Sequence, residues 1–370
     1  MKRVPVILAL LAAGWQAPTF ADSPRWELQF FHDADDSELM INDLAFPSSR
    51  TGVAAGFLLE RGRVRPRVLV TRDGGRNWRF AETREVGLSL FFLREDLGWM
   101  VTERAIWRTT DAGSSWQRVA RLRGLLRVYF LDENRGYAVG VRKAAYETAD
   151  GGKTWTKLAA ADQPDSQPER TVYGWIEFAN DKRGSIVGWS VPRRDREQRL
   201  PDWMDPESAE KQRQWPTFTI VLQTDDGGRT WKHSTTSMFG RITRLRSSPG
   251  GRGLALVEFH DTFEWPSEVF RIDLRMDKTE RAYREKNRAV TDAALAGNVA
   301  YLAAIEPPGK LRQAPVPGRL VMIRSEDLSQ WSEMEVDYRA YGRRATLALG
   351  GEKDVWVATD TGMILRLVEH

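Results

Sequence analysis

The chain has 370 residues, a formal net charge of +4 and no cysteine. The lack of cysteine excludes disulfide bonds, thiolate metal sites and cysteine nucleophiles. Acidic and basic residues are interspersed along the sequence, which predicts a mixed surface and argues against a nucleic-acid partner.

The N-terminal segment 1–21 has the features of a signal peptide. Lys2 and Arg3 precede an apolar stretch at 4–13, and Thr19-Phe20-Ala21 places small residues at the usual cleavage positions, so we expect cleavage after Ala21. The apolar stretch is too short to span a bilayer, and no later stretch is long enough. We therefore expect a single mature domain over 22–370, periplasmic or secreted, without a membrane span.

One eight-residue pattern recurs four times and predicts a repeat architecture. The spacing of its aspartates, of which the last step is twice the first, is that of propeller blades. In this pattern, the Asp-box, the carboxylate can close a hairpin turn, the glycine supplies a positive φ, and the tryptophan can wedge the hairpin against the next sheet. We interpret the repeated positions as structural, not catalytic. They are Thr71, Asp73, Gly75 and Trp78, then Thr109, Asp111, Gly113 and Trp116, then Thr148, Asp150, Gly152 and Trp155, then Thr224, Asp226, Gly228 and Trp231.

The blade count follows from apolar stretches that are each followed by a turn and a glycine-led strand. This pattern starts four blades, and an insertion at 191–217 lengthens the fourth and accounts for the doubled spacing. Two further blades follow over 241–283, which lacks the octet, and over 289–337, which carries a worn copy of it. The last stretch, 345–367, supplies three strands, and the N-terminal stretch 26–30 can supply the fourth. We predict an all-β propeller of four-stranded antiparallel blades, seven in number with six as the alternative, closed by the N-terminal strand.

The octets, together with strands such as Gly136–Gly140 before them and the closing stretch 354–362, resemble the photosystem II assembly and stability-factor-like propellers, an Asp-box (BNR-like) family. The resemblance covers most of 24–369 and weakens past Trp231. It implies a β-propeller and a non-catalytic exported factor that binds a membrane-protein subunit during assembly. The insertion and the fifth blade without an octet depart from the family's pattern.

A glycoside hydrolase of sialidase-like type is the enzymatic alternative, because sialidases are also Asp-box propellers. The nearest string to their arginine motif is Phe270-Arg271-Ile272-Asp273, which has aspartate where proline is required. Sugar hydrolysis needs two carboxylates, and Asp261, Glu264 and Glu268 lie beside aromatic residues. A decorated loop explains this cluster as well. The histidines lack metal-ligand spacing, so we expect no catalytic, cofactor-binding or metal-binding residues and no cofactor.

The insertion carries the candidate partner contacts, since arginine and tryptophan are favoured at binding hot spots. These contacts are Arg193, Arg194, Trp203 and Trp215, which would project from one rim of the propeller. We predict a monomeric, non-catalytic, exported binding or assembly factor that engages another envelope or membrane protein through a propeller face or rim. A secreted structural or adhesion module is a further alternative to the hydrolase.

Overall fold

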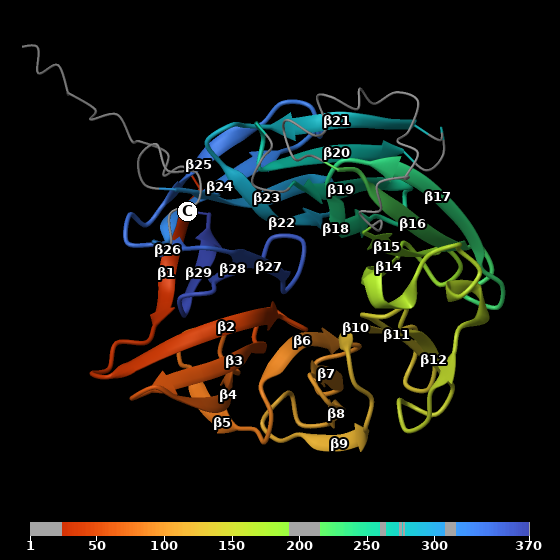
Figure 1. Ribbon diagram of the computed structural model, residues 1–370. Helices are drawn as coiled ribbons and strands as arrows, with labels where there is room; N and C mark the ends of the chain where they lie inside the picture. Colours follow the sequence, from red (N-terminus) through yellow and green to blue (C-terminus); the bar gives the residue numbers. More distant parts are fainter. Residues whose placement is uncertain are drawn as a thin grey trace, which may run out of the picture.

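The described part of the chain folds as a ring of β-sheets with almost no helix. The computed structural model describes residues 24–191, 215–259, 264–273, 276, 278–307 and 316–369. Five sheets have four antiparallel strands each, and a sixth sheet of nine strands joins two blades. Figure 1 shows the sheets around a common axis, with the first strand of each blade innermost. The predicted seven-bladed β-propeller is confirmed, and the six-bladed alternative is wrong.

Each blade takes four consecutive strands, except the last. The first three blades contain β2 (Ser37–Ala45), β3 (Gly52–Glu60), β4 (Arg63–Thr71) and β5 (Arg79–Glu82), then β6 (Gly87–Phe92), β7 (Gly98–Thr102), β8 (Ile106–Thr109) and β9 (Gln117–Ala120), then β10 (Leu125–Phe130), β11 (Gly136–Gly140), β12 (Ala145–Thr148) and β13 (Thr156–Lys157). Two short 3₁₀ helices, η1 (Ala159–Ala161) and η2 (Pro168–Arg170), lead to blade 4.

The remaining blades repeat this arrangement. Blades 4 and 5 contain β14 (Thr171–Phe178), β15 (Gly184–Ser190), β16 (Thr217–Thr224) and β17 (Lys232–Met238), then β18 (Arg241–Ser247), β19 (Arg252–Glu258), β20 (Ser267–Asp273) and β21 (Lys278–Arg284). Blade 6 contains β22 (Ala289–Ala296), β23 (Val299–Glu306), β24 (Gly318–Ser325) and β25 (Ser332–Val336), with β26 (Tyr341–Gly342) paired to β24. Blade 7 contains β27 (Ala345–Leu349), β28 (Val355–Thr359), β29 (Met363–Val368) and β1 (Arg25–Phe31).

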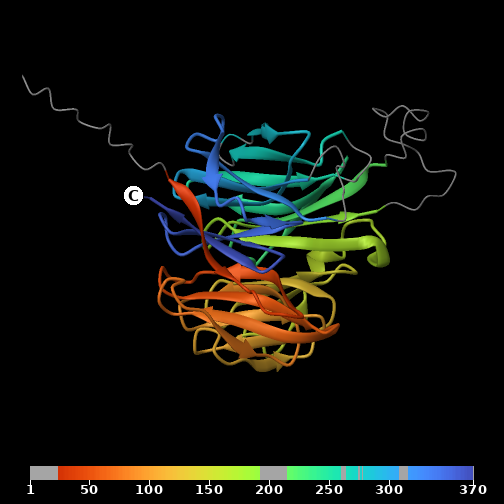
Figure 2. The ribbon, with the colours of Figure 1, turned by 90° about the vertical axis from the view of Figure 1, so that its left-hand side faces the viewer.

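The two ends of the chain close the ring together. Strand β1 pairs antiparallel with β29, from Arg25 opposite Val368 to Phe31 opposite Met363. Figure 2 shows the red N-terminal strand lying against the blue C-terminal strands. Trp26, on β1, is 1% exposed within the core shared by blades 6 and 7. Closure by the N-terminal strand, as predicted, satisfies the sheet edge of blade 7.

The four octets form the same hydrogen-bonded loop between the third and fourth strands of their blades. In blade 3, Asp150 Oδ1 accepts hydrogen bonds from the Thr148 hydroxyl at 2.8 Å and from the Thr154 backbone N–H at 2.9 Å. The Thr148 hydroxyl in turn accepts from the Gly152 N–H at 3.1 Å. Equivalent bonds recur around the aspartates of the other three octets. These bonds hold the carboxylate inside its own loop and away from the axis of the ring.

The worn octet of blade 6 closes in a related way. Asp327 Oδ1 accepts from the N–H groups of Ser329 at 2.8 Å and Gln330 at 2.7 Å. Leu328 adopts φ +62° where the other octets place glycine, a conformation that costs free energy for a side chain with a Cβ. The turn is therefore preserved without its glycine.

Aromatic rings fill the space between each of blades 1 to 4 and the blade that precedes it in the ring. In each of blades 1 to 4, a phenylalanine at the end of the innermost strand covers the glycine that begins the second strand, so that a Cβ on that glycine would meet the ring at 2.4 to 2.6 Å. In blade 3, Phe130 also stacks on Trp99 of blade 2, with centroids 3.6 Å apart, and meets the octet tryptophan Trp155 edge-to-face at 6.1 Å. The four pairs are Phe46 with Gly52, Phe92 with Gly98, Phe130 with Gly136, and Phe178 with Gly184.

Several predicted segments lie outside the described residues. These include the signal peptide 1–21 and residues 192–214 of the insertion, with Arg193, Arg194 and Trp203. Trp215 is described, half-buried, just before β16. Within the described ranges, no helix has the length and apolar character needed to cross a bilayer.

Candidate functional site

The innermost strands carry charged side chains toward the axis of the ring. Six of these seven strands have a β-bulge that shifts the register by one residue. A bulge re-aims the side chain that follows it, which is why bulges are common beside functional sites. The residues after the bulges are Asp43, Ser89, Arg127, Trp175, Arg244 and Asp292, in blades 1 to 6.

Three guanidinium groups surround one tryptophan at this level. The Cζ atoms of Arg127, Arg244 and Arg246 lie 3.7, 4.7 and 4.7 Å from the ring centroid of Trp175. Cation–π attraction favours this arrangement, and it is stronger where water is excluded. Three cations this close together repel one another, and nearby carboxylates are needed to offset that repulsion. We call the resulting group the axial cluster: Asp43, Arg127, Trp175, Glu177, Arg244, Arg246 and Asp292.

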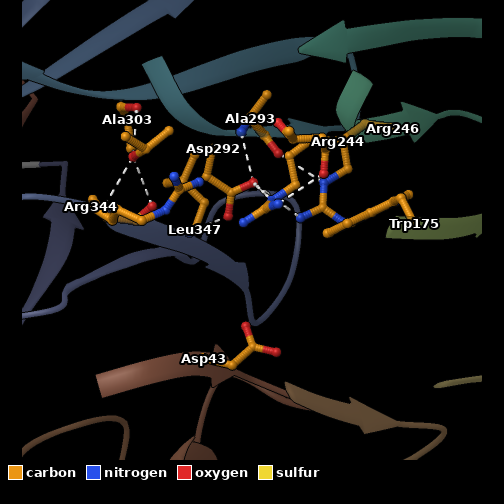
Figure 3. Close-up of polar contacts among 12 residues, drawn as sticks. Asp43, Trp175, Arg244, Arg246, Asp292, Ala293, Ala303, Arg344 and Leu347 are labelled. Atoms are coloured by element: carbon orange, nitrogen blue, oxygen red, sulfur yellow. Dashed lines mark hydrogen bonds and ion pairs between the residues drawn. The ribbon is translucent and has the colours of Figure 1, made fainter. Parts of the chain in front are cut away.

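Asp292 is the most enclosed carboxylate of the axial cluster, with a side chain 1% exposed. Its Oδ1 lies 3.1 Å from Arg244 Nε and 3.5 Å from a terminal nitrogen of Arg246. Its Oδ2 accepts from the Leu347 N–H of blade 7 at 2.9 Å. Burial acts to raise the pKa of Asp292, but Arg244 and Arg246 outweigh it, so the pKa lies below its ordinary value. Figure 3 shows these contacts converging on the carboxylate.

Asp43 lies on the innermost strand of blade 1, separated from Asp292, as Figure 3 shows. Its Oδ2 accepts from the Leu90 N–H of blade 2 at 2.8 Å and lies 3.7 Å from Arg127. Asp43 and Asp292 therefore each tie their own blade to the innermost strand of the next blade. Burial raises the pKa of the Asp43 carboxyl, and Arg127 opposes this shift.

Glu177 completes the charge balance of the axial cluster. Its Oε2 accepts from the Trp175 indole N–H at 3.3 Å and lies 3.7 Å from Arg246. Burial raises the pKa of Glu177, against the attraction of Arg246. Three carboxylates thus face three guanidinium groups, and the cluster offers ionic contacts to a ligand without a large net charge.

Arg127 differs from the other two arginines. Arg244 and Arg246 donate to Asp292 and to the carbonyl of Ala293, respectively. The Arg127 guanidinium makes no hydrogen bond to any described residue, and the side chain is only 21% exposed. Burial lowers its pKa to about 10, so the group remains charged at neutral pH. A guanidinium has five N–H donors, and those of Arg127 lack an acceptor from the described part of the chain.

Arg127 lines a cavity of about 310 Å³ on the axis, together with Asp43, Glu177, Arg246 and Asp292. Its other walls come from the ends of the innermost strands. Because strands alternate in direction, this is the same side of the ring as the octet turns. The volume lies at the lower end of the range for ligand sites. It suits a side chain or a chain end better than a folded surface.

The predicted carboxylate cluster is not on the axis. Glu268 pairs with Arg284 at 3.0 Å, and Glu264 is in contact with Lys286. Arg284 and Lys286 also lie over the ring of Trp265, so these groups form an ionic cluster in blade 5, in which Glu268 is buried and Glu264 is exposed. Asp261 lies outside the described residues. The arginine of the string 270–273 lies on β20 and pairs with Glu280 of the adjacent strand.

Sequence reasoning missed the axial cluster. One signal could have found it: Asp43, Ser89, Arg127, Trp175 and Arg244 each stand nine positions before the glycine that begins the second strand of the blade. Four of these five residues are charged or aromatic, whereas the neighbouring positions of the same strands are mostly apolar. In the described ranges, no group of three or more potential ligands could hold a metal ion.

Comparisons with known proteins agree with the resemblance seen in the octets. No protein-family model matches the chain. The chain is 25% identical over 219 residues to the photosystem II assembly lipoprotein Ycf48 of Prochlorococcus marinus, which covers 54% of this chain and 59% of that protein. It is 27% identical over 172 residues to Ycf48 of Synechococcus sp., covering 41% of this chain and 50% of that protein. The matches therefore span only half to three-fifths of these relatives.

Solved structures share the fold over nearly the whole chain. A structure of YCF48 bound to a D1 peptide has a TM-score of 0.58, is 17% identical and covers 92% of this chain and 99% of its own. YCF48 from Cyanidioschyzon merolae gives a TM-score of 0.56 at 17% identity, covering 92% and 98%. A WD40 propeller domain of Doa1 gives 0.55 at 9% identity, covering 93% of this chain and 97% of its own. At these identities the similarity establishes the fold alone.

Proposed function

We propose that this protein is a non-catalytic, exported assembly factor that binds an anionic segment of another envelope or membrane protein. The sequence similarity to Ycf48 supports a role in assembly. That one similar propeller was solved with a peptide of D1 supports a protein partner in place of a small substrate.

Arg127 is the observation that carries the binding site. Its charged guanidinium lies against Trp175, lines the axial cavity and makes no hydrogen bond to a described residue. A carboxylate can take two parallel N–H bonds from such a group. The partner's carboxylate would enter the cavity and bind Arg127, while the pairs around Asp292 stay intact. Arg and Trp together are also the residues most enriched at binding hot spots.

The pairing of the carboxylates favours binding over glycoside hydrolysis. Asp43 and Asp292 accept backbone hydrogen bonds from adjacent blades, and Glu177 accepts from Trp175. A general acid or a nucleophile must reach a substrate atom within hydrogen-bond distance, and these oxygens already accept other bonds, which for the two aspartates join adjacent blades. The octet aspartates are similarly engaged in their own loops.

A second proposed contact lies at the predicted insertion, whose flanking strand ends, Ser190 and Thr217, are on the side of the ring opposite the octet turns and the cavity. Trp215 is half-buried at the start of β16, at the edge of the predicted insertion. A partner in the envelope requires an exported protein, so the proposal includes export and cleavage after Ala21. It also includes a contact with the partner through Arg193, Arg194 and Trp203.

Capture of the partner tests the proposal. Tagged protein is cross-linked in the source organism's envelope fraction, and captured proteins are quantified by mass spectrometry for the wild type, Arg127→Gln and Arg104→Gln. Arg104 is a matched control because its side chain is 66% exposed and, among the described residues, pairs only with its neighbour Glu103. We expect one partner to be lost with Arg127→Gln and kept with Arg104→Gln. Equal capture by all three proteins, or turnover in a panel of fluorogenic glycosides, would contradict the proposal.

A further inference from the structure

The space between blades 4 and 5 is filled differently from the others. In every blade, one residue of the second strand faces the next blade, at the position paired with the end of the innermost strand. Six blades place an apolar or aromatic side chain there. Blade 4 has a serine. In blade order the residues are Val53, Trp99, Tyr137, Ser185, Leu254, Tyr301 and Trp356.

Blade 5 does not compensate for this serine. The position that holds phenylalanine in blades 1 to 4 is Ser247, which pairs with Gly253. The nearest atoms to a Cβ on Gly253 are backbone atoms of Arg246 and the Cβ of Ile272, so no ring from the described residues covers this glycine. Blade 5 also lacks the octet and therefore its tryptophan. All three rings of the usual interface are missing at this one place.

The packing of β18 reflects the missing rings. None of its seven residues is fully buried, whereas five of the eight residues of β14 are. A cavity of about 560 Å³ lies there, lined by Ser185, Gln223, Ser247, Gly253 and Ile272. Protein interiors are close-packed, so an unfilled space of this size at a recurring position of the repeat is unusual. We call it the blade 4–5 seat.

The seat has one polar and one apolar wall. Glu177, Ser185 and Gln223 are directly paired across three strands of blade 4, so their side chains form one polar row. Leu245 and Ile272 of blade 5 supply apolar surface. A phenol ring fits such a space because it is apolar on its faces and polar at its tip. Blade 3 offers the precedent, since the Tyr137 ring fills the equivalent space and its hydroxyl donates to the Gly227 carbonyl at 3.2 Å.

We propose that the blade 4–5 seat receives a tyrosine side chain of a partner protein. The ring would lie between Ile272 and the uncovered face of Gly253, and the hydroxyl would donate to the polar row. The seat shares Glu177 and Arg246 with the axial cavity, so a segment bound at the axis can reach it. Arg183 and Asp225, both exposed at its edge, provide opposite charges for the partner's backbone.

Disulfide exchange at a single thiol tests the seat directly, because the natural chain has no cysteine. Gln223→Cys places the thiol in the seat. Glu147→Cys is the matched control, since Glu147 holds the same row position in blade 3, where Tyr137 and Phe178 fill the space. Each variant is equilibrated with a tyramine-derived disulfide and with a cyclohexyl disulfide of equal length. We expect the phenol probe to be preferred about tenfold at Gln223→Cys, the scale of one buried ring with one hydrogen bond, and not at Glu147→Cys.

Filling the seat should abolish the preference. Ser185→Tyr restores the ring of blade 3 and Ser247→Phe restores the ring of blades 1 to 4, whereas Ser185→Ala leaves the space open. Two filling variants are used so that the test still stands if one of them does not fold. A melting curve shows whether each variant is folded. A preference that is equal at both thiols, or that survives filling, would overturn the inference.

A competition arm identifies the source of the ring. The peptide acetyl-Gly-Tyr-Gly-amide should protect the Gln223→Cys thiol at lower concentration than free tyrosine, because a partner presents the side chain within a peptide. Better protection by free tyrosine would overturn the assignment to a protein partner. The assay contains no envelope partner, so its failure leaves the proposal for Arg127 to be judged by its own capture experiment.

Discussion

Replacing Asp292 with asparagine tests whether the axial cluster holds the ring together. The side chain is 1% exposed, accepts from the Leu347 N–H and faces Arg244 and Arg246. An asparagine keeps the shape but removes the charge, and its amide N–H₂ must face either the guanidinium donors or the backbone donor. Breaking a buried ion pair by removing one partner costs about 3–5 kcal/mol, because a buried charge is left without compensation. We expect a loss of that size in the free energy of unfolding, measured in urea with an unchanged m-value.

Glu169→Gln provides the matched control for this measurement. It makes the same carboxylate-to-amide change in a pair with Arg142 at 3.5 Å, where the arginine and glutamate side chains are 71% and 64% exposed. Exposed pairs contribute about 0–1 kcal/mol, so the control should lie within that range. The pKa of Asp292 is lowered by folding, so its contribution is present above the ordinary value of 3.8 and is lost as the pH falls below it. A loss below about 1 kcal/mol for Asp292→Asn, equal to the control, would refute the reasoning.

Three further predictions concern the packing and the octets. Phe130→Ala removes a ring that is 1% exposed and stacked on Trp99, and we expect it to lower the free energy of unfolding in urea by about 3–5 kcal/mol. The control Phe80→Ala, whose ring is 41% exposed, should lose much less. Similar losses would contradict the packing of Phe130 between blades 2 and 3. Hydrogen bonds from Thr154 lower the pKa of Asp150 from its ordinary value of 3.8 to about 2, so its stabilisation is complete above pH 3.8 and lost toward pH 2. The melting temperatures of wild type and Asp150→Asn should therefore differ at pH 7 and converge near pH 2, and a constant difference would argue against this role. Ser185→Tyr fills the blade 4–5 seat and should stabilise the protein by about 0.5–2 kcal/mol, as cavity-filling changes do, whereas destabilisation would mean that the space cannot accept a ring.

The sequence predicted the scaffold because the interactions that define each blade join residues close together in the sequence. An octet such as 148–155 makes its hydrogen bonds within its own short loop, so its chemistry is visible in the order of the residues. The blade count followed from the same periodicity, and the closing strand from the shortage of one strand at the C-terminal end. Strand β1 pairs with β29, at the opposite end of the chain, and so supplies the fourth strand that the C-terminal stretch lacks.

The axial cluster was not predicted because its members are distant in sequence and meet only when the ring closes. Asp43 and Arg127 belong to blades 1 and 3, with the whole of blade 2 between them in the sequence. Each charged residue, taken singly, looks like a solvated strand residue, and only the offset to the following glycine relates one blade to another. The blade 4–5 seat was missed for a similar reason, since Ser185 and Ser247 look like ordinary strand residues until their equivalents in other blades are compared.

Site-specific photo-cross-linking tests the central claim, that a partner segment enters the axial cavity and binds Arg127. A benzophenone amino acid replaces Leu349, which lines the cavity, or Val64, which is 54% exposed at the outer hairpin of blade 1. Illumination in the envelope fraction should join one partner to position 349 and not to position 64, and Arg127→Gln should remove that product. A product that forms equally from both positions, or one at 349 that persists without the guanidinium, would contradict the account.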